Sequence, residues 1–142
     1  VFPFATEAEN QAGSRFSPDG RWLTYHSNES GRFEVYVRAF PGPGGKWQIS
    51  TAGGGNPAWS RDGKELFYLT PDNKLAAVPI ATGATFRAGS PVALFPVHPS
   101  GNRTVFDVSP DGRRFLVNSL PADQGSPPLE LVVHWTSLLA KN

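Results

Sequence analysis

The chain carries histidine, serine and aspartate, the residue types from which a hydrolase builds a nucleophilic triad. Its histidines are His26, His98 and His134. The serine nucleophile of an α/β-hydrolase stands in a Gly-x-Ser-x-Gly elbow between a strand and a helix. No such elbow occurs in the sequence. We therefore predict no catalytic residue and no enzymatic activity within this chain.

A glycine-rich stretch at residues 42–46 resembles a phosphate-binding loop only superficially. The motif would need glycine at position 40 and serine or threonine at position 47, which are Phe40 and Trp47. We interpret the stretch as a hairpin loop. The chain has no cysteine, and its histidines and carboxylates lack the spacing of metal ligands. The sequence therefore predicts neither a metal site nor a cofactor.

Aspartate followed by glycine recurs three times, each time two residues after a serine. The pairs are Asp19-Gly20, Asp62-Gly63 and Asp111-Gly112. Three aspartates could be read as metal ligands, but turn chemistry explains them without a metal. Aspartate hydrogen-bonds its own backbone two residues on, and glycine adopts the left-handed conformation that side chains disfavour. We predict that these six residues set three tight hairpins.

Strand-like segments follow each Asp-Gly pair with a period of two residues. The third and fifth positions after the glycine are apolar or tyrosine every time, as in Leu66 and Tyr68. A third strand follows at 33–38, 74–78 and 129–135, and a fourth at 46–51 and 91–97. The third repeat has no fourth strand, whereas an unmatched strand-like segment stands at residues 1–6.

The spacing of the repeats indicates the architecture. Asp19, Asp62 and Asp111 are separated by 43 and 49 residues, and four-stranded antiparallel units of this length are blades of a β-propeller. We predict an all-β chain, 1–142, with blades at 13–51, 56–97 and 104–137 and an outer strand at 1–6. Three blades are half of a six-bladed propeller. The four tryptophans are expected to pack in its core.

Composition excludes several classes of partner. The formal net charge is +1 with no block of like charge, so neither nucleic acid nor an anionic membrane is an expected partner. No apolar run reaches the about 20 residues needed to span a bilayer, so membrane insertion is not expected. The sequence favours neither bacterial cytoplasm nor periplasm. It starts at Val1 and contains no methionine, which predicts a processed, excised or engineered piece of a longer chain.

The sequence also resembles a known family of repeats. The segments that show the resemblance are Phe-Ser-Pro-Asp-Gly-Arg at 16–21, the turn at 28–31, the strand at 35–38, the segment at 45–50 and the run at 62–68. Together with Val133-His134-Trp135 they resemble TolB-type (WD40-like) propeller repeats, similar to the C-terminal propellers of bacterial serine/threonine kinases. Such repeats also occur in TolB and in prolyl-oligopeptidase-like peptidases. The resemblance implies a sensor or interaction domain, and no kinase motif is present in this chain.

Three blades leave open sheet faces and edges, which favour association. The strand at 1–6 could complete the third blade of a second copy, so that a homodimer closes a six-bladed ring. Phe2, Phe4, Leu131 and Val133 are the candidate contacts between chains. The alternative is a fragment of a longer single-chain propeller.

The function predicted from the sequence is a non-catalytic module for interaction with a protein, a peptide or a ligand. The alternatives are the gating propeller of a prolyl-oligopeptidase-like serine peptidase and an engineered half-propeller without a native ligand. Binding loops vary freely on such a scaffold, so the sequence does not identify the ligand.

Overall fold

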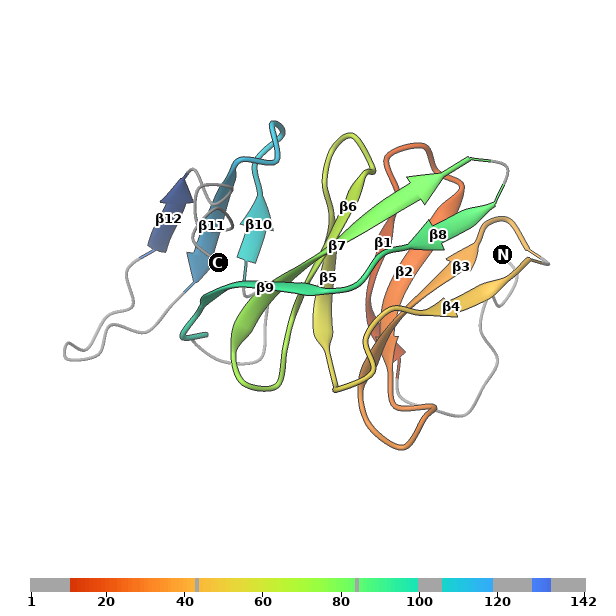
Figure 1. Ribbon diagram of the computed structural model, residues 1–142, viewed down its shortest axis with the longest axis horizontal. Helices are drawn as coiled ribbons and strands as arrows, with labels where there is room; N and C mark the ends of the chain where they lie inside the picture. The colour runs from red at the N-terminus through yellow and green to blue at the C-terminus, as the bar shows by residue number, and fades with distance from the viewer. Residues whose placement is uncertain (1–10, 43, 84, 100–105, 119–128, 134–142) are drawn as a thin grey trace.

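The structure, a computed structural model, describes residues 11–42, 44–83, 85–99 and 106–118, and the backbone of the strand Leu129–Val133. In these ranges the chain forms twelve strands, β1 to β12, and no helix. All strand pairs are antiparallel and belong to three successive sheets, which lie side by side in chain order (Figure 1). These ranges accordingly include no helix able to cross a membrane.

The first sheet has four strands in the order of the chain. They are β1 (Gln11–Phe16), β2 (Trp22–Ser27), β3 (Glu34–Ala39) and β4 (Lys46–Gln48). β1 begins ahead of residue 13, where the sequence placed the start of the blade, and β4 is shorter than the predicted strand at 46–51. The stretch at 42–46 joins β3 to β4, and the Ala39 N–H donates to the Gly45 carbonyl at 3.2 Å.

The second sheet has one strand more than the sequence predicted. Its strands are β5 (Gly55–Trp59), β6 (Glu65–Leu69), β7 (Lys74–Thr82), β8 (Phe86–Ala88) and β9 (Val92–Pro96). The beginning of β7 pairs with β9, which matches the strand expected at 91–97, and the end of β7 pairs with β8. The strand predicted at 74–78 thus continues to Thr82, and the outer position is shared by two segments.

The third sheet has three strands in the part of the chain that the structure describes. They are β10 (Phe106–Val108), β11 (Arg114–Asn118) and β12 (Leu129–Val133). Leu131 pairs with Leu116, and Val133 with Arg114. The positions of the Leu131 and Val133 side chains, and of Phe2 and Phe4, lie outside the described residues. The predicted exchange of a strand therefore stays a prediction.

Two apolar layers hold the sheets together, and the middle sheet contributes to both. Leu66 and Tyr68 on β6 face the first sheet, whereas Phe67 between them faces the third. This alternation follows from the two-residue period of a strand. The layer between the first and second sheets includes Val35, Val37, Ile49, Leu66, Tyr68, Ala76, Val78, Ile80 and Phe86. The layer between the second and third includes Phe67, Leu75, Ala77, Val97, Phe106, Phe115 and Val117.

The unpredicted strand β8 fastens the second sheet to the first. Its Phe86 is buried, and its ring lies 5.0 Å from that of Trp22 and 4.9 Å from that of Trp47. The two indoles meet edge to face at 5.4 Å. These tryptophans and Trp59 pack against the first apolar layer, which is the core position expected for them. Phe86 therefore adds an aromatic contact between neighbouring sheets.

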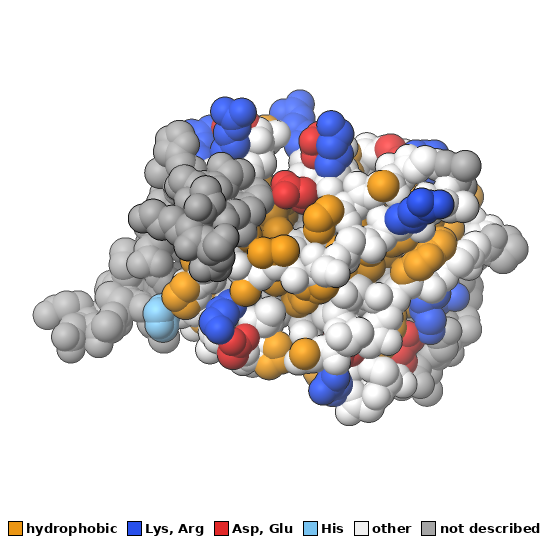
Figure 2. Space-filling model, in the orientation of Figure 1, with side chains coloured by type: hydrophobic (Ala, Val, Ile, Leu, Met, Phe, Trp, Pro, Cys, Tyr) orange, Lys and Arg blue, Asp and Glu red, His pale blue; other side chains and the backbone are white. Residues whose placement is uncertain are grey.

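The face seen in Figure 2 carries no large patch of charged side chains of one sign. Basic and acidic side chains are interspersed around its rim, and apolar side chains lie across its middle. This distribution matches the formal net charge of +1.

Candidate functional site

The three Ser-x-Asp-Gly turns share one hydrogen-bonding pattern. In the first, the Gly20 N–H donates to the Ser17 carbonyl at 2.9 Å and glycine takes φ +69°. The Ser17 hydroxyl donates to Asp19 Oδ1 at 2.6 Å, and its Oγ accepts the Trp22 N–H at 3.0 Å. Asp19 Oδ1 also accepts the Arg21 N–H at 3.1 Å. The same contacts recur around Asp62 and Asp111.

A related turn, one residue shorter, joins β6 to β7 at the polar turn that the sequence predicts there. The Thr70 hydroxyl donates to Asp72 Oδ1 at 2.6 Å, and Thr70 Oγ1 accepts the Lys74 N–H at 3.0 Å. Asn73 occupies the glycine position with φ +56°, a conformation that asparagine tolerates better than most residues. The signal in the sequence was Thr-Pro-Asp-Asn, with threonine for serine and asparagine for glycine.

The turn aspartates are ionised, and their carboxylate oxygens already accept hydrogen bonds within the turns. Hydrogen bonds from the Ser60 hydroxyl and the Lys64 N–H lower the pKa of Asp62. For Asp19, slight burial raises the pKa, but hydrogen bonds from Ser17 and Arg21 outweigh it, so the pKa is lowered. Within the described ranges, no three histidine or carboxylate side chains gather where they could hold a metal ion. The geometry thus gives these carboxylates a role in the turns.

Of the two histidines that the structure describes, His26 lines a hollow of the surface. Its Nδ1 accepts the Asn56 N–H at 3.4 Å, and its ring meets that of Phe33 edge to face at 5.6 Å. Accepting at Nδ1 assigns the proton of the neutral ring to Nε2, and burial lowers the His26 pKa. His98 is exposed, and His134 lies outside the described residues.

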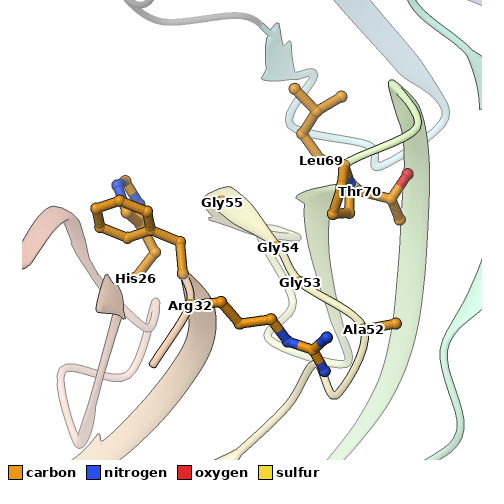
Figure 3. A pocket seen from close by; sticks show the side chains of 10 residues that line it. His26, Arg32, Ala52, Gly53, Gly54, Gly55, Leu69 and Thr70 are labelled. Atoms are coloured by element: carbon orange, nitrogen blue, oxygen red, sulfur yellow. The ribbon is translucent and has the colours of Figure 1, made fainter. Parts of the chain in front are cut away.

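That hollow, here called the interblade cleft, lies where the ends of the first two sheets meet. Its volume is about 590 Å³. His26 and the ring beside it stand on one side, Leu69 and Thr70 on the other, and Gly53, Gly54 and Gly55 pass between them (Figure 3). The lining is completed by Arg32, Phe33, Ala52 and Pro71. The lining is mostly apolar, and the three glycines contribute only their backbone to its floor.

A buried carboxylate holds the floor of the cleft in place. Glu34 is 1% exposed, and its two oxygens accept the Gly53 N–H at 2.9 and 3.0 Å. The Ser50 hydroxyl also donates to Glu34, and Arg32 Nε donates to its Oε1 at 2.7 Å. Arg32 makes a further contact with the Thr51 carbonyl. Because a buried charge needs such partners, Glu34 fixes the link that joins the two sheets.

Comparisons with known proteins agree on the architecture. No family model matches the chain. The chain superimposes on TolB from Acinetobacter baumannii with a TM-score of 0.66 and 19% identity, covering 88% of this chain and 30% of that one. The fold is that of a TolB-type β-propeller. A structure assigned as a 6-phosphogluconolactonase from Bacteroides uniformis matches with a TM-score of 0.56 and 18% identity, over 91% of this chain and 42% of that one.

One curated relative is similar in sequence. A Streptomyces coelicolor protein named as a putative tricorn protease homolog is 31% identical in an alignment of 122 residues that covers 81% of this chain. The chain spans about a tenth of the length of that relative, and less than half of either solved structure. What these whole proteins do is therefore not assigned to this chain by the similarity.

The loops that line the interblade cleft lie at the end of the blades opposite to the three Ser-x-Asp-Gly turns (Figure 1). The turn between β2 and β3, the link between β4 and β5, and the turn between β6 and β7 meet there. Loops at one end of a rigid scaffold are a common place for binding residues.

A smaller cavity of about 320 Å³ lies between the first strands of the three blades. Arg15 on β1, Ala58 on β5, and Phe106 and Asp107 on β10 contribute to its lining. The first strands of propeller blades surround the central channel, so this cavity belongs to the channel side.

The cleft residues were not among the predicted site residues. The sequence suggests a link between blades at 53–57, but the strand β5 already begins at Gly55, so only Gly53 and Gly54 of that stretch belong to the link. The available signal was a run of three glycines, Gly53 to Gly55, longer than a turn needs. Phe33 and Leu69 come from other hairpins, so only the fold brings them to the same glycines.

Proposed function

We propose that this chain is a non-catalytic propeller module that binds a protein, a peptide or a small ligand at the interblade cleft. The observation that carries the proposal is a cleft of about 590 Å³ with an apolar lining and a bare backbone floor. Binding sites are typically concave and mostly apolar, with a few placed polar groups. Here the polar groups are His26 and Arg32.

The surroundings of His26 favour binding over catalysis. A general base needs a free ring nitrogen within hydrogen-bond reach of a nucleophile. His26 Nδ1 already accepts the Asn56 N–H, and the neighbouring side chain is the Phe33 ring. The positive charge of Arg32 is balanced by Glu34 at 2.7 Å.

The assembly we propose is a homodimer that closes a six-bladed ring, with residues 1–6 of one chain completing the third blade of the other. Two features support it. The third sheet has three strands in the described part of the chain, against four in the first. Leu116 is 43% exposed on the face of β11 opposite to the buried Phe115 and Val117, where a further blade would pack.

A second candidate is the accessory propeller of a serine peptidase. It is favoured by the 31% identity to a protein named as a tricorn protease homolog. Attachment to a kinase, which the repeat resemblance implies, is the corresponding alternative. A peptidase or kinase segment encoded beside this one in the same gene would decide between them.

Binding is tested by mapping ligands on the isotopically labelled 142-residue chain by NMR. A mixture of small fragments and short peptides should shift amide signals at 28–33, 52–55 and 69–71, with no turnover of ester, amide or ATP substrates. The turns at 17–20 and 60–63 lie at the other end of the blades and serve as an internal control. Shifts confined to those turns, or turnover, would overturn the proposal.

A further inference from the structure

Resting on the proposed function, we propose that the interblade cleft binds an organic carboxylate with an apolar body. The guanidinium of Arg32 holds the carboxylate, and the apolar side chains of the lining hold the rest of the ligand. Two sources share this chemistry: the C-terminus of a peptide that ends in an apolar residue, and a free organic acid.

Arg32 has hydrogen-bond donors that the described part of the chain does not use. A guanidinium carries five N–H donors. Nε donates to Glu34 Oε1 at 2.7 Å, and Nη2 donates to the Thr51 carbonyl. The second hydrogen of Nη2 and both of Nη1 have no partner among the described residues. Because the Arg32 side chain is 60% exposed, a ligand reaches these donors without displacing a protein group.

The contacts that Arg32 already makes hold its guanidinium in place. Glu34 is 1% exposed, and it is itself fixed by the Ser50 hydroxyl and the Gly53 N–H. Figure 3 shows Arg32 extending along the cleft toward Ala52. A guanidinium held in this way loses little side-chain freedom when it binds an anion, and its planar fork matches a carboxylate.

The ion pair with Glu34 leaves Arg32 able to bind a second carboxylate. Glu34 is buried and does not line the cleft, and it spreads its negative charge over hydrogen bonds from Arg32, Ser50 and Gly53. The cleft lining itself contains no carboxylate. The charge that a ligand meets in the cleft is therefore positive.

The remaining polar side chains of the lining also favour a ligand that accepts hydrogen bonds. His26 Nε2 carries the proton of the neutral ring and has no printed partner among the described residues. The Thr70 hydroxyl already donates to Asp72 and accepts the Lys74 N–H. The side-chain groups left for a ligand are thus donors, which suit a carboxylate and offer nothing to an ammonium group.

The rest of the lining favours an apolar body on that carboxylate. Phe33 is 48% exposed and stands on one side, with Leu69 and Pro71 on the other. The volume of about 590 Å³ leaves room for much more than a carboxylate. Burial of apolar surface against these side chains adds to the affinity, and an inorganic anion lacks that contribution.

The test titrates 3-phenylpropionate into the isotopically labelled 142-residue chain at pH 7. Saturable NMR shifts should appear at the Arg32 Nε–H and at the amides of Phe33 and Gly53. The neutral 3-phenylpropanamide, the cationic 3-phenylpropylamine and inorganic phosphate should each have a dissociation constant larger by about tenfold or more, since each lacks either the charge-assisted hydrogen bonds or the apolar contacts. Equal binding of any of the three at the cleft would overturn the proposal.

Matched arginine variants test the contact itself. Arg32→Gln should weaken 3-phenylpropionate by about tenfold or more and change the binding of 3-phenylpropanamide by less than about twofold. Arg61→Gln is the control, because Arg61 is exposed in the second Ser-x-Asp-Gly turn, outside the cleft lining. Unchanged acid binding by Arg32→Gln, or equal loss of acid and amide, would contradict a direct contact between Arg32 and the carboxylate.

A peptide distinguishes the two sources of the carboxylate. If acetyl-Ala-Ala-Phe with a free C-terminus binds tighter than 3-phenylpropionate, and its C-terminal amide does not, the ligand is a peptide C-terminus. If the peptide binds no tighter than 3-phenylpropionate, the ligand is a free organic acid. If fragments from the mixture bind the cleft but acids bind no tighter than their amides, this inference fails and the proposed binding module stands. If nothing binds the cleft, both fail.

Discussion

At the scale of single residues, the repeated aspartates act through hydrogen bonds within their own turns. Asp62 accepts from the Ser60 hydroxyl at 2.8 Å and from the Lys64 N–H at 3.1 Å. Both contacts favour the ionised carboxylate, so the Asp62 pKa lies below the ordinary value of 3.8. A carboxyl group whose pKa is lower in the folded than in the unfolded state stabilises the fold above the unfolded pKa. That contribution is lost as the pH falls through the folded pKa.

We predict that Asp62→Asn removes part of this pH dependence. The urea midpoint of the parent chain should fall as the pH drops below about 4, because the turn carboxylates become protonated. The difference between parent and variant should be greatest near pH 6 and should vanish near pH 2. Urea unfolding followed by tryptophan fluorescence between these values measures it. Ser60→Ala removes the donor and should behave similarly; a constant difference across the range would contradict the prediction.

At the scale of elements, segments beyond the regular strands add contacts between blades to those of the two apolar layers. The link after β4 is held by Glu34, whose two carboxylate oxygens share the Gly53 N–H. The β7–β8 hairpin places Phe86 against Trp22 and Trp47. Neighbouring blades are therefore joined at one end by a buried carboxylate and elsewhere by an aromatic cluster.

We expect Phe86→Ala to lower the free energy of unfolding by about 3 kcal/mol, since it truncates a buried aromatic ring and leaves a cavity. Phe86 is 3% exposed. Tryptophan emission should also change, because two indoles lose a neighbour. Phe33→Ala is the matched control: this ring is 48% exposed and its removal should cost less than about 1 kcal/mol. Equal losses of unfolding free energy in the two variants, measured by urea unfolding, would show that β8 does not stabilise the contact between the first two sheets.

At the scale of the whole molecule, the question is what meets the free face of the last blade. Leu116 is exposed there. On the first blade, Tyr25 and Tyr36 stack at 5.7 Å and are 2% and 3% exposed in the single chain. The two ends of the three-bladed unit therefore differ, and a second copy would have to accommodate both.

For the proposed homodimer, light scattering should give about twice the chain mass of 15.3 kDa. Deleting residues 1–6 should return the mass to that of a single chain, because the third blade then lacks its donated strand. Leu116→Glu should weaken the dimer by placing a charge on the packed face. A monomeric parent chain would contradict the dimer and would favour a fragment of a longer propeller.

Much of the fold could be predicted from local signals. The Asp-Gly turns and the alternation in segments such as β6 depend on neighbours within a few residues, and they gave the all-β propeller architecture. The strand β8 could not be predicted in this way. Phe86 stands in a short segment whose place depends on the distant Trp22 and Trp47. The continuation of β7 past Pro79 was likewise hidden, because proline usually marks the end or edge of a strand.

Turn type, strand period and repeat length were determined by the sequence itself, because each depends on the conformational preferences of adjacent residues. The interblade cleft was decided only by the tertiary structure. Its walls come from His26 and Phe33 in one hairpin and Leu69 in another, and blade packing brings them to the glycine link.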